Sequence, residues 1–222
     1  VITAATKEEE RFHLTCEAIE KVIKPSTKAI LINSPSNPTG AVLSLDELKA
    51  IAQFAKERDL IVISDEPYES IVYDGRKNYS IAALPDMFER TITVNSFSKT
   101  FAMTGWRVGY AVAEEAFINA MTVMQESLTS SVNAASQYAA CVALTSPKDE
   151  VEEMRRIYEK RAELLERGLN RIKGFSFIKP EGAFYLWLKS PIKDDKAFCE
   201  AAKKYHLLIV PGSSFAGEGY VR

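Results

Sequence analysis

The chain has 222 residues, of which 46% are hydrophobic and 26% charged, and its formal net charge at pH 7 is −2. This is the composition of a globular protein with room for one large domain or slightly more. The near-neutral charge gives no indication of a nucleic-acid partner or of binding to an acidic membrane surface. No apolar run approaches the roughly 20 residues that a bilayer-spanning helix needs, so no membrane partner is expected.

The cysteines and histidines exclude two further classes. Cys16, Cys141 and Cys199 lie far apart and form no CxxC pair. A disulfide framework is therefore not expected, and a reducing cytoplasm is the predicted compartment. The two histidines, His13 and His206, have no companion at metal-ligand spacing, so no metal site is predicted.

Short apolar strands alternate with amphipathic helices over the first two-thirds of the chain. Strands are predicted at residues 29–33, 60–63, 91–94 and 107–113. A helix is predicted from Ser44, whose capping box includes Glu47, to about residue 58. Apolar strands separated by helices are typical of a mostly parallel sheet with helices on both faces, so the predicted fold class is α/β.

The remaining third has a different pattern. Helices are predicted at residues 114–128 and 133–144, and a long charged helix then runs from about 146 to 173 and ends before Gly174. Beyond it come short strands and one helix, with the strands at 175–178, 184–188 and 207–210 and the helix at 194–205. We therefore expect a large domain (1–146), an interdomain helix (147–173) and a small α+β domain (174–222).

Both ends of the chain are strand-like. The chain opens without Met in a β-branched segment, and residues 219–222 also have the pattern of a strand. Neither end resembles a natural terminus, so we interpret the sequence as a fragment with both domains incomplete.

Polar clusters follow three of the predicted strands, at residues 33–40, 64–68 and 95–99. The carboxyl ends of parallel strands line one edge of a sheet, and ligands of open α/β sheets bind there. We therefore expect the three clusters to lie close together and to form a ligand site.

Lys99 and Asp65 are the chemically distinctive members of these clusters. A lysine held partly desolvated at a strand end, beside other cations, can form a Schiff base, although a solvated surface lysine is the alternative. A carboxylate at a buried strand end needs a partner, and the protonated pyridine nitrogen of pyridoxal phosphate would be one. The alternative for Asp65 is an aspartate that only caps the turn before Pro67.

Two further residues are candidates for binding a ligand. Asn37 lies in a loop that two prolines and a glycine make rigid, from which its amide can reach a ligand oxygen, although a plain turn would have the same composition. Arg107, between Trp106 and Val108, is a candidate for binding an anion such as a phosphate.

Four motifs in order carry a family resemblance. They are Ser-Asn-Pro-Thr-Gly (36–40), Asp-Glu-Pro-Tyr (65–68), Ser-Phe-Ser-Lys (96–99) and Gly-Trp-Arg-Val-Gly (105–109). At these spacings the chain resembles, over its full length, the class I aminotransferases of the aspartate-aminotransferase type. These are pyridoxal-phosphate enzymes of fold type I.

The resemblance implies a role for each residue around the cofactor ring. Lys99 would hold pyridoxal phosphate covalently and, once released, move the substrate proton. Asp65 would keep the pyridine nitrogen protonated, and such an ion pair should depress the pKa of the Asp65 carboxyl. Tyr68 and Asn37 would donate hydrogen bonds to the ring oxygen, although Tyr68 could simply pack in the core.

The resemblance also implies which residues bind the two anionic groups. Ser96 and Arg107, with Ser98 assisting, would bind the phosphate. Arg222, assisted by Asn37, would bind the substrate α-carboxylate through a bidentate pair. Arg222 is the last residue of the chain, and this assignment depends on the motif around it rather than on local chemistry. The aromatic residues of Glu-Gly-Ala-Phe-Tyr (181–185) also fit the family and are interpreted as core.

The implied activity is transfer of an amino group between an L-amino acid and a 2-oxo acid by a ping-pong mechanism, in a cytoplasmic homodimer. Two alternatives share the motifs: another fold-type I enzyme, such as a β-lyase or an aminocyclopropane-carboxylate synthase, and the aminotransferase-like sensor domain of a transcription regulator. Residues 130–133 contain no arginine, which argues against one mode of aspartate recognition and leaves the amino donor open. Family members have more chain on both sides, so the isolated 222 residues are expected to be inactive.

Overall fold

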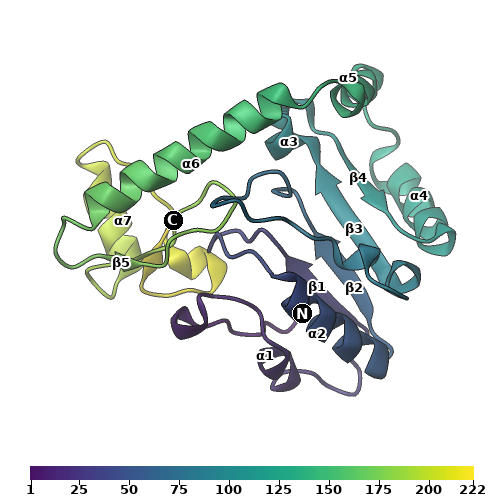
Figure 1. Cartoon of the computed structure of the whole chain (residues 1–222), viewed down its shortest axis with the longest axis horizontal. Helices are drawn as coiled ribbons and strands as arrows, with labels where there is room; N and C mark the ends of the chain where they lie inside the picture. Colours follow the sequence, from purple (N-terminus) through teal and green to yellow (C-terminus); the bar gives the residue numbers. More distant parts are fainter.

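Two β-sheets organise the chain, whose computed structural model describes residues 1–222 (Figure 1). The first sheet has four strands, in the spatial order β1 (Ala29–Asn33), β2 (Ile61–Asp65), β3 (Thr91–Ser96) and β4 (Gly109–Val112). Its first three strands are parallel and β4 is antiparallel to β3. The second sheet has three short antiparallel strands, β5 (Ser176–Phe177), β6 (Leu188–Lys189) and β7 (Tyr220–Val221). This mainly parallel α/β architecture confirms the predicted fold class.

Seven α-helices accompany the sheets. They are α1 (Cys16–Glu20), α2 (Leu45–Glu57), α3 (Phe97–Thr100), α4 (Glu115–Thr129), α5 (Ala134–Thr145), α6 (Asp149–Leu169) and α7 (Asp195–Lys203). Short 3₁₀ turns lie at Glu8–Glu10, Ile81–Ala83, Phe88–Arg90, Thr104–Trp106 and Gly212–Phe215. None of the helices is both long enough and apolar enough to cross a membrane.

Helix α2 packs against the first sheet and contributes much of its hydrophobic core. It begins at the predicted capping box, in which the Ser44 side chain accepts from the backbone N–H of Glu47 and the Glu47 carboxylate accepts from that of Ser44. Its buried side chains join Ile30 and Ile32 of β1 in one hydrophobic cluster. Leu31, which alternates to the other face of β1, is 64% exposed. The helical cover of this sheet is therefore tight on one face of β1 and open on the other.

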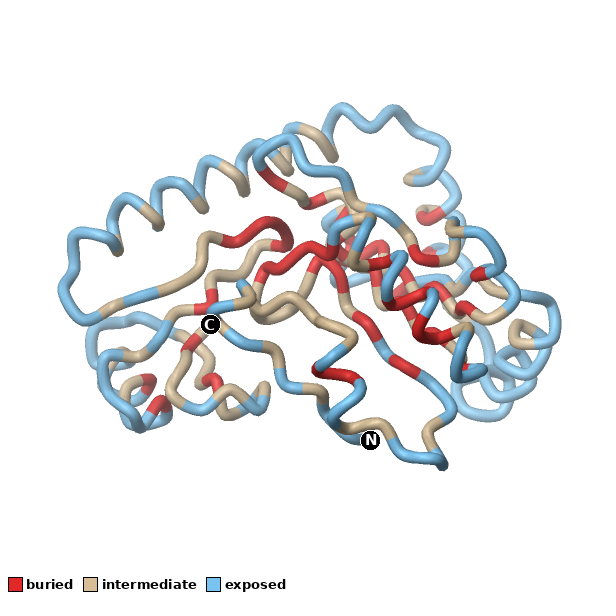
Figure 2. The backbone as a smooth tube through the Cα atoms, turned by 60° about the horizontal axis from the view of Figure 1, so that its bottom comes forward, coloured by how far each residue is buried: buried red, intermediate tan, exposed pale blue.

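Helix α6 runs along the outside of the molecule from the end of α5 towards α7 (Figure 1). None of its residues is buried, and Figure 2 shows its backbone exposed or half-buried along its length. This agrees with the charged surface helix that the sequence predicts, but the helix is shorter, because residues 170–173 form turns before Gly174 at φ +93°. The division of the chain into domains stays a prediction.

Several predicted strands are shorter or absent. Residues 1–7 form no strand, and neither do residues 207–210, although Val210 exchanges two backbone hydrogen bonds with Arg222. In the predicted strand 184–188 only Leu188 is in β6. The backbone before it is already paired elsewhere, because the 181–183 segment bonds to residues 71–73 and forms a bridge between Val72 and Gly182.

The register of the first sheet aligns the ends that carry the polar clusters. Asn33, at the end of β1, lies opposite Asp65 at the end of β2, and Asp65 lies opposite Val94 of β3. Because the three strands are parallel, the segments that follow them leave the sheet at the same edge, as the sequence predicts.

Candidate functional site

A hydrogen-bonded path leads from Asp65 to Arg222 at the carboxyl edge of the first sheet. Asn33 Nδ2 donates to Asp65 Oδ2 at 3.0 Å and to the Asp65 carbonyl at 3.0 Å. Asn33 Oδ1 in turn accepts from the backbone N–H of Asn37 at 2.7 Å. Arg222 Nη1 donates to Asn37 Oδ1 at 2.8 Å. The structure thus joins three predicted site residues, Asn37, Asp65 and Arg222, through Asn33.

Tyr68 and Lys99 lie on the aromatic side of the same region. The Tyr68 side chain is buried, and its hydroxyl shares a hydrogen bond of 2.6 Å with the Tyr185 hydroxyl. The Lys99 ammonium lies 5.6 Å from the centroid of the Phe184 ring, which packs edge-on against Tyr68. The Arg222 guanidinium lies 4.4 Å from the centroid of the Tyr185 ring. Phe184 and Tyr185 therefore connect the lysine, the tyrosine and the arginine that the sequence singles out.

Lys99 stands on a short helix at the end of the third strand. The short helix α3 follows β3 directly, and Ser96 caps it by accepting from the Ser98 backbone N–H at 3.2 Å. The Ser98 carbonyl accepts from the Thr104 hydroxyl at 3.0 Å. The Ser96 hydroxyl proton is left free by this cap and can still be donated to a ligand.

Arg107 lies near Ser96 and Ser98, the other two residues that the resemblance assigns to the phosphate. It lies before β4, in the left-handed region at φ +53°, and not in the predicted strand. Its guanidinium is exposed and donates to the Thr104 carbonyl at 3.0 Å. Ser98 and Arg107 are thus joined through Thr104, and Ser96 is joined to Ser98 by the cap. No hydrogen bond links these three residues to the Asp65–Arg222 path.

The electrostatics of Asp65 fit a cationic partner. Burial raises the pKa of its carboxyl, and the hydrogen bond from Asn33 opposes that shift. No side-chain cation of the chain forms a salt bridge with it, so the depressed pKa that the sequence suggests would need a partner from outside the chain. A half-buried carboxylate with acceptor sites to spare suits a protonated ring nitrogen. Together with a primary amine and two arginines, this donor set fits pyridoxal phosphate.

Burial also raises the pKa of Tyr68, and the hydrogen bond with Tyr185 adds to the shift. The phenol is therefore held in its neutral form, which can donate a proton to an acceptor oxygen. This is the form that a hydrogen bond to the ring oxygen of the cofactor requires.

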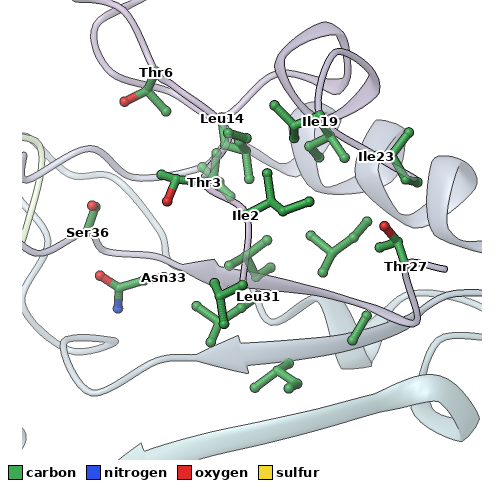
Figure 3. Close-up of a pocket in the computed structure, with 18 of the residues that line it drawn as sticks. Ile2, Thr3, Thr6, Leu14, Ile19, Ile23, Thr27, Leu31, Asn33 and Ser36 are labelled. Carbon is green, nitrogen blue, oxygen red and sulfur yellow. The ribbon is translucent and has the colours of Figure 1, made fainter. Parts of the chain in front are cut away.

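Two surface hollows border the site without enclosing Lys99. One, of about 750 Å³, is mainly apolar and lies between the first residues of the chain, α1 and β1. Figure 3 shows Ile2 and Leu31 among the residues that line it, with Asn33 and Ser36 at one end. The other, of about 620 Å³, is lined by six residues of which Arg107 is the charged one. Its neighbours are Ala102, Gly105, Trp106, Asn133 and Ser136.

Tyr185 is the site residue that the sequence interpretation missed. Phe184 and Tyr185 pack against the buried cluster around Tyr68, as the core interpretation predicts. Both are only half-buried, however, and their rings also lie beside Lys99 and Arg222. Phe215, whose ring centroid lies 4.7 Å from the Arg222 guanidinium, was not singled out either. The signal available in the sequence was an aromatic pair directly after a small residue, Ala183.

Comparison with known proteins gives a consistent result. A family model described as aminotransferase class I and II matches residues 1–222. Aromatic-amino-acid aminotransferase 2 of Thermococcus litoralis is 48% identical to the chain, and aspartate aminotransferase of Pyrococcus abyssi is 47% identical. Each alignment covers 100% of this chain, which spans 58% of the length of either relative.

Solved structures match over the same extent. The aromatic aminotransferase from Pyrococcus horikoshii superposes with a TM-score of 0.94 at 46% identity, over 100% of this chain and 61% of that one. The aspartate aminotransferase from Thermus thermophilus with maleate has a TM-score of 0.94 at 37% identity, over 99% of this chain and 58% of that one.

Proposed function

The chain belongs to the class I and II aminotransferase family, and on that premise we propose that its full-length protein is a pyridoxal-phosphate-dependent aminotransferase. It would move an amino group between an L-amino acid and a 2-oxo acid by a ping-pong mechanism. The observation that carries the proposal is the hydrogen-bonded path from Asp65 through Asn33 and Asn37 to Arg222. One end offers a carboxylate to a ring cation and the other a guanidinium to a carboxylate.

Pyridoxal phosphate, when bound, supplies the electron sink that this chemistry needs. In the proposed reaction, Lys99 would hold the cofactor covalently. Once free as an amine, its Nζ would take the proton from the substrate Cα and deliver it to C4′ of the cofactor. The Asp65 carboxylate keeps the ring nitrogen protonated. Tyr68 and Asn37 donate to the ring oxygen. We propose that the phosphate is bound by Ser96, Ser98 and Arg107.

Arg222 is the proposed binding group for the substrate α-carboxylate. Its guanidinium has one N–H donating to Asn37 Oδ1, which leaves other donors of the planar fork for a bidentate pair. The rings of Tyr185 and Phe215 lie beside it and shield it from part of the solvent. Aspartate and aromatic amino acids are the donors to compare first, because the relatives carry the names of both.

We also propose a cytoplasmic location and a homodimer for the full-length protein. Three free cysteines support a reducing compartment. Exposed apolar residues on α4 and α5 support an assembly that covers them. They include Val123, Met124, Leu128 and Tyr138.

The proposal is tested by the half-reaction. The full-length protein, loaded with pyridoxal phosphate, is mixed with one amino acid, and the visible absorbance of lysine-bound cofactor is expected to convert to that of pyridoxamine phosphate. A stoichiometric 2-oxo acid should appear. Lys99→Ala should abolish the conversion, whereas Lys173→Ala, at an exposed lysine outside the site, should leave it unchanged.

Two outcomes would contradict the proposal. Continuous release of 2-oxo acid and ammonia, without accumulation of pyridoxamine phosphate, would indicate a lyase. No spectral change with any amino acid would favour a binding or sensor role. The 222-residue chain alone is expected to be inactive or nearly so, since the chain spans 58% of the length of its relatives.

A further inference from the structure

An ionic cluster of five residues lies beside the loop that carries Asn37. We call it the His13 cluster, and its members are Arg11, His13, Glu47, Arg76 and Glu181. His13 Nδ1 lies 2.7 Å from Glu47 Oε1, and His13 Nε2 lies 2.9 Å from Glu181 Oε2. Glu181 Oε1 also pairs with Arg11 Nε and Arg76 Nη2, each at 3.1 Å. The side chain of Glu181 is only 5% exposed, so these are buried contacts on the carboxylate side.

The geometry of His13 requires its charged form. A neutral imidazole has one N–H donor, whereas both ring nitrogens of His13 lie within hydrogen-bonding distance of a carboxylate oxygen. Only the imidazolium can donate to both. Consistently, the hydrogen bond to Glu181 raises the pKa of His13, and burial opposes that shift. Burial works against ionisation of Glu181, but its hydrogen bond from His13 and the other partners lower its pKa to about 2.

The His13 cluster gathers four parts of the chain. Arg11 and His13 come from the N-terminal segment, Glu47 from the first turn of α2, Arg76 from the turn after Tyr73 and Glu181 from the segment before Ala183. These are the charged groups that face His13 from the elements packed around it. With His13 charged, three cations meet two carboxylates; with His13 neutral, one carboxylate loses its imidazole donor.

Glu181 also holds the loop of residues 36–41, which we call the Asn37 loop. The backbone N–H groups of Glu181 and Gly182 both donate to the Gly40 carbonyl at 2.9 Å. The Glu181 carboxylate accepts from the Val42 backbone N–H at 3.2 Å, just past the loop. On the other flank, Glu47 joins His13 to the Ser44 cap of α2. The backbone that follows the Asn37 loop is thus connected to His13 twice, at Val42 through Glu181 and at Ser44 through Glu47.

The same segment places the aromatic side of the site. The Ala183 backbone N–H donates to the Ile71 carbonyl at 2.8 Å, and Phe184 and Tyr185 follow directly. Tyr185 then contacts Tyr68 and Arg222. A displacement of Glu181 would therefore shift the Asn37 loop on one side and Tyr185 on the other, without acting through Lys99.

From these contacts we infer that His13, in its charged form, is a positioning residue that holds the Asn37 loop and the 181–185 segment together around the cofactor. The inference rests on the proposed function, because it assigns the loop and the segment to a pyridoxal-phosphate site. His13 is not among the residues proposed to bind the cofactor or the substrate. It acts through Glu181 and Glu47. When the imidazolium loses a proton, only one ring N–H remains, and one of the two hydrogen bonds to these carboxylates is lost.

The first test is the affinity of the full-length protein for pyridoxal phosphate across pH. At pH 6, His13→Asn is expected to raise the dissociation constant at least about tenfold, which corresponds to about 1.4 kcal/mol. Above the pH at which His13 loses its charge, the two proteins should differ by less than about twofold, because the wild-type imidazole is then neutral. His206→Asn is the matched control, since His206 is exposed and its φ of +61° suits asparagine.

A second variant and a variant-free measurement keep the test independent of folding defects. Glu181→Gln should weaken binding at pH 6 to a similar degree and should remove the pH-dependent step. In the cofactor-free wild type, hydrogen exchange of residues 36–43, corrected for intrinsic rates, should accelerate as pH rises through the His13 titration. It should not do so in His13→Asn.

The outcomes separate the two claims. Suppose the wild type binds pyridoxal phosphate, and the ratio of the His13→Asn dissociation constant to that of the wild type is the same at pH 6 and above the His13 titration. That result would overturn the positioning role and leave the proposed function intact. Hydrogen exchange of residues 36–43 without a pH-dependent step would also overturn it. A wild type that forms no lysine-bound cofactor would overturn the proposed function and, with it, this inference.

Discussion

Gly40 is the position in the Asn37 loop where a single methyl group should be most costly. Its φ is +73°, in the left-handed region, where a residue with a Cβ is disfavoured by about 1–2 kcal/mol. A Cβ there would also lie 2.7 Å from Pro180 Cβ and 3.0 Å from the Gly182 carbonyl oxygen. Relieving such overpacking typically costs about 1–3 kcal/mol. Gly40→Ala is therefore expected to lower the free energy of unfolding by about 2–5 kcal/mol.

The assay is denaturant unfolding of three matched glycine variants. Gly75→Ala has the same backbone cost, at φ +68°, but its Cβ would meet nothing within 4 Å. Gly105→Ala has neither a positive φ nor a neighbour and should be close to neutral. The order Gly40→Ala, Gly75→Ala, Gly105→Ala, from most to least destabilised, is the expected result. If Gly40→Ala is no worse than Gly75→Ala, the close packing of the 180–182 segment on the Asn37 loop is refuted.

Three further predictions concern the site. Burial raises the pKa of Asp65 in the folded chain, so ionisation of this carboxyl disfavours folding as the pH rises above its unfolded-state pKa of about 4. Asp65→Asn should therefore raise the urea midpoint of the cofactor-free protein at pH 7. The same variant should weaken pyridoxal-phosphate binding at least about tenfold. An unchanged cofactor affinity would argue against the Asp65 role. Tyr185→Phe removes the hydroxyl that is hydrogen-bonded to Tyr68. It should move the pH midpoint of the lysine-bound cofactor absorbance by up to about one pH unit, and lower the free energy of unfolding by less than about 1.5 kcal/mol. An unmoved midpoint would show that the two hydroxyls are not coupled in the holoenzyme. Arg222→Lys loses the planar fork, so the KM for the amino acid should rise about tenfold or more, and an unchanged KM would remove Arg222 from carboxylate binding.

The sequence predicted the parts of the fold that depend on local pattern. The strand at residues 29–33 and the Ser44 capping box of α2 appear where apolar continuity and the residue spacing place them. The parallel direction of the strands follows from the class of fold, and it brings Asn33 and Asp65 to the same edge of the sheet. Local pattern was enough for the strand and the capping box because each is set by neighbours within a few residues.

Features decided by distant partners could not be predicted in this way. Residues 184–188 have the composition of a strand, but the backbone before them is paired with residues 71–73 and most of the segment lies outside the second sheet. His13 has no partner at close spacing, and its two carboxylates are 34 and 168 positions away. Tyr185 finds Tyr68 across 117 positions. Arg107 leaves the predicted strand because its backbone takes a left-handed conformation that apolar neighbours do not signal.

The central claim is that Lys99 carries the cofactor. Its most direct test is reduction of the full-length protein with borohydride in the presence of pyridoxal phosphate, followed by peptide mapping. The account predicts one pyridoxyl group per chain, on Lys99, and none in Lys99→Arg. A pyridoxyl group on another lysine of the wild type, or none at all, would contradict it.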